Sequence, residues 1–163
     1  MTDKKITICA VDFSDSKQRT DLCQQLIAYS SDPMGGGRAL AEDTAQRSIA
    51  LLAEKTYAFS FLAYDGDTPV GFSNCFENVS TFASRCNVNI HDLAVLPEYR
   101  GRGIGKQLLQ AIEDAAKARD YCKITLEVLE GNHIAQNAYN NFGFEGYQLS
   151  DETGRALFWQ KTI

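Results

Sequence analysis

Residues 91–106, HDLAVLPEYRGRGIGK, contain the densest group of side chains and glycines that could do chemistry. A β-type run is followed by three glycines at alternate positions, and an amphipathic helical pattern begins at Gly103. A helix start offers unpaired backbone N–H groups and the positive end of the helix dipole, so a glycine turn there can hold phosphate. Arg100, Arg102 and Lys106 would add positive charge around it. The stretch therefore predicts a phosphate-binding turn.

Two familiar phosphate loops do not fit this turn. A P-loop places Ser or Thr after its Gly-Lys pair, whereas Gln107 follows Gly105-Lys106. A dinucleotide fingerprint needs a third glycine at position 106, where lysine stands. The alternative is a helix start whose glycines serve tight packing. The order of strand, glycines, two arginines and long helix favours phosphate binding.

Hydrophobic periodicity and turn signals predict a mixed α/β sheet with the element order βααβββαβαββ. An Asp65-Gly66-Asp67 turn predicts a hairpin in the first half of the chain. Expected strands cover residues 6–11, 57–64, 70–76, 88–95, 123–128, 144–149 and 156–161, and expected helices cover 16–31, 42–54, 103–119 and 134–141.

Length and composition predict one folded domain over residues 1–163. The 163 residues are 44% apolar and 23% charged, which excludes the disordered and fibrous classes. The net charge of −5 argues against nucleic-acid binding and slightly favours a cationic small substrate. The sequence has no apolar run of membrane-spanning length, no signal-peptide core, and five isolated cysteines without zinc spacing. We expect a cytoplasmic protein that binds neither membrane nor metal.

The glycine turn and a second motif resemble the GNAT N-acetyltransferase superfamily. Residues 100–105, RGRGIG, match its (Arg/Gln)-x-x-Gly-x-(Gly/Ala) signature, and Leu93-x-Val95-x-Pro97-x-Tyr99 matches the lead-in strand. The second motif comprises Leu126-Glu127-Val128, Asn132, Ala138-Tyr139 and Phe142-Gly143-Phe144. The resemblance extends over residues 6–161.

The resemblance implies a mostly antiparallel sheet, flanked by helices, whose fourth and fifth strands splay apart around acetyl-CoA. By position, the backbones of Leu93, Ala94 and Val95 would contact pantetheine and the acetyl group, and Asn132 would bond the pantetheine arm. The residues assigned to the pyrophosphate are Arg100, Gly101, Arg102, Gly103, Ile104 and Gly105, with Lys106 beside them. An exposed strand edge suits an amide-bearing arm, and the glycine turn suits its phosphates.

Acetyl transfer to an amine needs a neutral nucleophile, stabilisation of an oxyanion and a proton for the leaving thiolate. By resemblance, the N–H of Leu93 or Val95 is the oxyanion donor. Tyr139, seven residues after Asn132, stands where the family usually places its general acid. Its alternative role is an aromatic that packs on the sheet.

His91 and Asp92 are the first candidates for the base. Diamine-type members of the family often carry Glu-Asp here; histidine, with a pKa of about 6.5, is a chemically suitable replacement. Asp92 could orient that imidazole, act as the base through water, or bind a cationic acceptor. Adjacent residues of a regular strand point to opposite faces, so both reach one site only if the strand is bulged. Glu127 is a third candidate.

By resemblance, the acceptor is expected near the loop at residues 32–37. Its three glycines could let the loop close over a substrate, and the alternative is a flexible connection between helices. Residues 80–85, STFASR, are similar to a stretch of polyamine and thialysine acetyltransferases, although Arg85 would suit a carboxylate. We therefore expect acetyl-CoA-dependent acetylation of a primary amine on a small polyamine or amino-acid-like molecule. The alternatives are a protein N-terminal or lysine acetyltransferase and a non-catalytic acyl-CoA-binding module. The resemblance also allows a homodimer.

Overall fold

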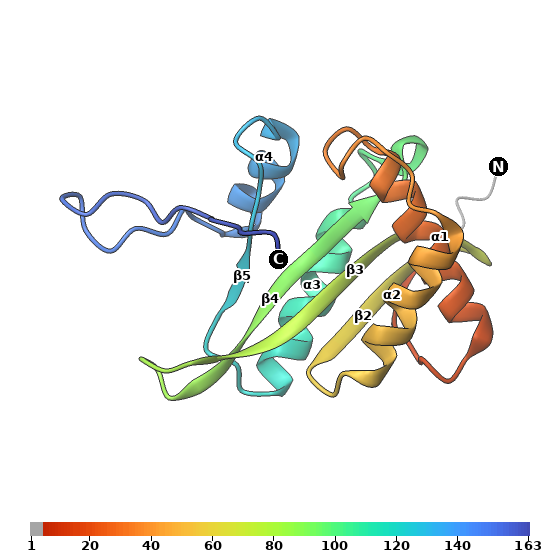
Figure 1. Ribbon diagram of the computed structural model, residues 1–163, viewed down its shortest axis with the longest axis horizontal. Coiled ribbons are helices and arrows are strands. Elements are labelled where there is room, and N and C mark those ends of the chain that lie inside the picture. Colours follow the sequence, from red (N-terminus) through yellow and green to blue (C-terminus); the bar gives the residue numbers. More distant parts are fainter. Residues whose placement is uncertain (1–4) are drawn as a thin grey trace. The chain divides into compact units, whose positions relative to one another are not determined.

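The computed structural model describes residues 5–163, which form two compact units (Figure 1). The first unit ends at Leu126 and contains a five-stranded sheet with three α-helices. The second unit, Glu127–Ile163, contains one helix and a C-terminal segment. The glycine turn lies in the first unit.

The sheet has the strand order β1-β2-β3-β4-β5, and all neighbours are antiparallel except β4 and β5. This confirms the predicted mixed, mostly antiparallel sheet. The predicted hairpin joins β2 to β3, with Gly66 in the left-handed region at φ +63°. The strands are β1 Ile6–Ala10, β2 Ala58–Asp65, β3 Thr68–Ser80, β4 Arg85–Val95 and β5 Ile124–Leu126.

Three α-helices cover the two faces of this sheet: α1 Ser16–Ser31, α2 Glu42–Glu54 and α3 Ile104–Ala118. Leu22 of α1 and Ile49 of α2 share a buried cluster with Phe72 of β3. A Cβ added to the neighbouring Gly71 would lie 3.5 Å from Leu108 of α3. Because adjacent strand residues face opposite sides, α1 and α2 cover one face and α3 the other (Figure 1).

The expected splay begins where β4 and β5 stop pairing. Their register runs from Val88↔Ile124 to Ile90↔Leu126, and β4 then continues to Val95. Among residues 5–163, no strand pairs with this last part of β4 on the edge away from β3. The chain thus leaves an open strand edge immediately before the glycine turn.

In the second unit, α4 His133–Phe142 forms as expected, but the two C-terminal strands do not. Asn132 caps α4 by accepting from the backbone N–H of Ala135, and Gly143 ends it at φ +110°. The predictions of strands at 144–149 and 156–161 are wrong: the structure has one isolated bridge there, Gln148↔Arg155. Residues 145–163 are exposed throughout, and a two-stranded ribbon without a buried face gains little from pairing. The expected strand 123–128 is likewise reduced to three residues.

No helix within residues 5–163 combines the length and apolar character needed to cross a bilayer. In the same residues, His, Cys, Asp and Glu side chains form no group of three or more that could hold a metal ion.

Candidate active site

The glycine turn leads directly from β4, through the short 3-10 helix η1 Pro97–Tyr99, into α3. Gly101 and Gly103 have φ values of +77° and +74°, which glycine adopts without steric cost. A Cβ added at Gly101, Gly103 or Gly105 would meet nothing within 4 Å. Tight packing therefore does not explain these glycines, and the turn borders open space that a ligand could enter.

The first turn of α3 is anchored in the core by one side chain, while the N-terminal end of the helix is uncapped. Ile104 is 1% exposed and fixes the first turn in the core. Gly103 is the N-cap, and no side chain of the described residues caps the helix. The first N–H groups of an α-helix have no intrahelical partner, so this end is suited to bind an anion.

Carboxylates already hold the two arginines of the turn. Arg100 Nη2 lies 2.6 Å from Asp32 Oδ2, and its Nε donates to the carbonyl of Val95 at 3.0 Å. Arg102 Nη1 lies 3.6 Å from Asp65 Oδ2. The hydrogen bond from Arg100 lowers the pKa of Asp32, with help from the backbone N–H of Met34. The Asp32 contact joins the loop after α1 to the glycine turn.

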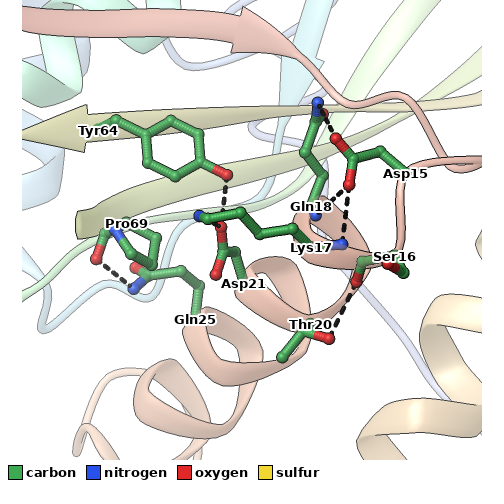
Figure 2. A network of polar contacts seen from close by, with 9 residues as sticks. All are labelled: Asp15, Ser16, Lys17, Gln18, Thr20, Asp21, Gln25, Tyr64 and Pro69. Atoms are coloured by element: carbon green, nitrogen blue, oxygen red, sulfur yellow. Dashed lines mark hydrogen bonds and ion pairs between the residues drawn. The ribbon is translucent and has the colours of Figure 1, made fainter. Parts of the chain in front are cut away.

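Polar contacts fix α1 against the sheet (Figure 2). The nearly buried carboxylate of Asp21 accepts from Tyr64 Oη at 2.7 Å and from Lys17 Nζ at 2.6 Å. Burial, followed by the contact with Asp21, raises the pKa of Tyr64. Gln25 Nε2 donates to the carbonyl of Pro69 at 2.9 Å. These bonds anchor the part of α1 from Lys17 to Gln25 to strands β2 and β3.

His91 is the extra residue of a β-bulge in β4. On β3, Asn74 pairs with Asp92 and the next residue, Cys75, pairs with Ile90. His91 is left over between these two pairs, which is the arrangement of a bulge.

The bulge brings His91 and Asp92 to the same face of the sheet. The ring of His91 lies 5.2 Å from the ring of Phe76, edge to face. Asp92 Oδ2 accepts from Asn74 Nδ2 at 2.9 Å. Asn74 and Phe76 are two residues apart on β3 and therefore share a face. The bulge that a joint role of His91 and Asp92 requires is therefore present.

A cavity of about 280 Å³ lies between α1 and the end of β4. Tyr29 and Asp32 line it from α1 and the following loop, and Ala94, Val95 and Arg100 line it from β4 and the turn. Burial raises the pKa of the Tyr29 hydroxyl, and the charges of Asp92 and Asp32 raise it further. Of these two carboxylates only Asp32 lines the cavity, so the cavity holds one phenol beside one carboxylate that is paired with Arg100.

The remaining candidates lie in the second unit. Asn132 uses its carbonyl oxygen to cap α4, which leaves its amide N–H groups as donors. The Tyr139 ring lies 5.8 Å from that of Phe144. Glu127 is exposed. The first unit thus brings together residues 91–106, while Asn132, Tyr139 and Glu127 belong to the other.

Sequence reasoning missed Tyr29 and Asn74. Tyr29 follows Leu22 by seven residues and continues the same helical stripe. Asn74 is an amide in the buried centre of β3, and a polar residue among mostly apolar neighbours is the signal that could have identified it.

Comparison with known proteins identifies the family. Residues 22–144, more than half of the chain, match the acetyltransferase (GNAT) family. This chain belongs to the GNAT family. An N-alpha-acetyltransferase 30 of Schizosaccharomyces pombe is 37% identical over 90 residues, covering 55% of this chain and 59% of that protein. A thialysine N-epsilon-acetyltransferase of Mus musculus is 30% identical over 104 residues, covering 55% of this chain and 61% of that protein.

The match thus spans less than two thirds of either relative. Among GNAT structures, an aminoglycoside N-acetyltransferase in complex with CoA is similar with a TM-score of 0.71 at 20% identity. That similarity covers 98% of this chain and 96% of the other, and it shows the fold.

Proposed function

We propose that this GNAT chain is one domain that transfers an acetyl group from acetyl-CoA to the primary amine of a small molecule. One observation carries the proposal: an open strand edge leads into a glycine turn and then into an uncapped helix start. Next to them, a bulge presents His91 and Asp92.

The first unit suits a phosphate-bearing coenzyme. The open edge at Leu93, Ala94 and Val95 has backbone groups for an amide-bearing arm, and the uncapped start of α3 lies beside glycines that border open space. Acetyl-CoA would supply the activated acetyl thioester. In our proposal Lys106 and the backbone of residues 100–105 hold its phosphates, and Asn132 donates to the pantetheine arm.

The catalytic residues would each move or stabilise one charge. His91 or Asp92 accepts the proton of the attacking amine, directly or through a water molecule. The backbone N–H of Leu93 or Val95 stabilises the negative charge on the carbonyl oxygen. Tyr139 donates a proton to the leaving thiolate. Asp92 is well suited to a cationic acceptor because its carboxylate lies on the same face as His91. Its charge also reaches Tyr29, whose pKa it raises.

A second candidate acceptor is a protein N-terminus, which the match to an N-alpha-acetyltransferase favours. The Asp92 carboxylate favours a small cation instead, because no described cation pairs with it and its charge reaches Tyr29, whereas Asp32 is already paired with Arg100. Release of free thiol from acetyl-CoA, measured with polyamines, amino acids, aminoglycosides and peptides, separates the two. We expect turnover with small amines, and turnover with peptides alone would contradict the proposal. His91→Ala and Asp92→Asn, compared over a range of pH, then identify the base.

A further inference from the structure

A buried polar chain crosses three strands and ends on Asp92. Ser60 of β2 and Asn74 of β3 are 1% and 2% exposed. Ser60 Oγ donates to Asn74 Oδ1 at 2.7 Å, and Asn74 Nδ2 donates to Asp92 Oδ2 at 2.9 Å. This chain of hydrogen bonds therefore runs from β2, inside the sheet, to β4, the strand that carries the bulge.

The chain lies on the sheet face that α1 and α2 cover. Ser60 alternates with Leu62 on β2, and Asn74 alternates with Phe72 on β3. Leu62 and Phe72 are fully buried in the cluster that includes Leu22 of α1. These polar side chains thus occupy inward positions that apolar residues could fill.

Burying a hydroxyl and an amide contributes little to stability even when they are paired, so the fold alone does not account for them. The order of Ser60, Asn74 and Asp92 fixes which end of the Asn74 amide faces Asp92. The Ser60 hydroxyl engages the carbonyl oxygen of Asn74, and this leaves the NH₂ of Asn74 facing Asp92. An NH₂ group donates to the Asp92 carboxylate and fixes one of its two oxygens.

We propose that Asn74, itself oriented by Ser60, is a positioning residue for Asp92, and that Asp92 receives the acceptor amine through its other oxygen. Among the described residues, Oδ2 accepts the Asn74 bond and no hydrogen bond reaches Oδ1. Next to the bulge, this holds a carboxylate in one orientation on the face where His91 also lies. The inference rests on the proposed acetyltransferase function and names residues that govern its acceptor site.

The test is a double-mutant cycle on the full chain, with the most active amine of the thiol-release panel. Asn74→Ala is expected to lower kcat/KM for the amine by about 10- to 100-fold, because a misplaced catalytic group costs that much. Ser60→Ala removes only the orienting hydroxyl and should lower it about two- to tenfold. The dissociation constant of acetyl-CoA should stay unchanged in both variants.

Combination with Asp92→Ala separates positioning from general damage to the fold. If Asn74 acts through Asp92, adding Asn74→Ala to Asp92→Ala causes no further loss of kcat/KM. Two matched controls are Asn87→Ala, a second buried asparagine of the sheet, and Ser73→Ala, a buried serine on the opposite face of β3. Both controls should keep kcat/KM near the wild-type value.

Each outcome decides something. Additive losses in the double variant, or equal losses in Ser60→Ala and Ser73→Ala, would overturn the positioning role while leaving the proposed function intact. Where Asn74→Ala does not fold or Asp92→Ala has no measurable turnover, the Ser60→Ala and Ser73→Ala pair decides alone. Wild-type protein without turnover on any amine would overturn the proposed function, and this inference with it.

Discussion

The ion pair between Asp32 and Arg100 provides a prediction whose size follows from the structure. Asp32→Asn keeps the shape of the side chain and removes its charge. The Asp32 side chain is 17% exposed and that of Arg100 is 48% exposed, so solvent screens much of their attraction at 2.6 Å. We expect a loss of about 1 kcal/mol in the free energy of unfolding at pH 7. For a chain of this length that lowers Tm by about 2–4 °C.

The loss should depend on pH with a definite sign. The pKa of Asp32 is lowered in the folded protein, so its ionised form contributes stability above the unfolded-state pKa of about 3.9. That contribution is lost as the pH falls through the lower, folded-state pKa. The difference between wild type and Asp32→Asn should therefore be the same at pH 7 and pH 5 and should shrink below about pH 4.

Denaturant unfolding at each pH measures this difference. Asp43→Asn is the matched control, because Asp43 pairs with Arg47 at 2.7 Å on the fully exposed face of α2 and should lose less. Equal stability of wild type and Asp32→Asn at pH 7, or a difference that persists unchanged well below pH 4, would refute the reasoning. A saturating concentration of CoA adds a second comparison. If the coenzyme phosphate draws Arg100 from Asp32, the difference between the two proteins becomes smaller.

Three further predictions concern other parts of the chain. Tyr139→Phe should lower kcat and leave acetyl-CoA affinity unchanged; unchanged turnover with chemistry rate-limiting would remove Tyr139 from the mechanism. Gly103→Ala forces a side chain into φ +74° and should cost about 1–2 kcal/mol of stability, with weaker CoA binding by calorimetry. Tyr64→Phe should cost about 1–2 kcal/mol by removing the bond to Asp21. Because the pKa of Tyr64 is raised, the wild type should also lose stability above about pH 10, and the variant less so.

The helices could be predicted because their signals are local. The expected bounds of the first two, 16–31 and 42–54, coincide with α1 and α2. Asp15 accepts from the backbone N–H groups of Lys17 and Gln18 at the start of α1, and Pro33 follows its end. Such capping residues and proline act within a few positions of the chain.

The two C-terminal strands that the sequence predicts do not form, because a strand depends on partners distant in sequence. Residues 144–149 and 156–161 have strand-like composition, yet Leu149, Leu157, Phe158 and Trp159 are all exposed. Their sequence carries the pattern, but the pairing reduces to the single bridge between Gln148 and Arg155.

The candidate site can be predicted from the sequence only in its local parts. Local motifs located the glycine turn and the pair His91-Asp92. The bulge that brings this pair to one face depends on the register with β3, and the contact between Asp32 and Arg100 joins residues far apart in the chain. Asn74 acquires its meaning only once Ser60 and Asp92 lie on either side of it.

A competition assay tests the central claim most directly. Purified protein is incubated with acetyl-CoA and an equimolar mixture of a small diamine, an amino acid with a side-chain amine, and a peptide with a free N-terminus. Mass spectrometry then measures which of them carries the acetyl group. We expect acetylation of a small amine, and its loss in a variant lacking both His91 and Asp92 side chains. Acetylation confined to the peptide, or undiminished in that variant, would contradict it.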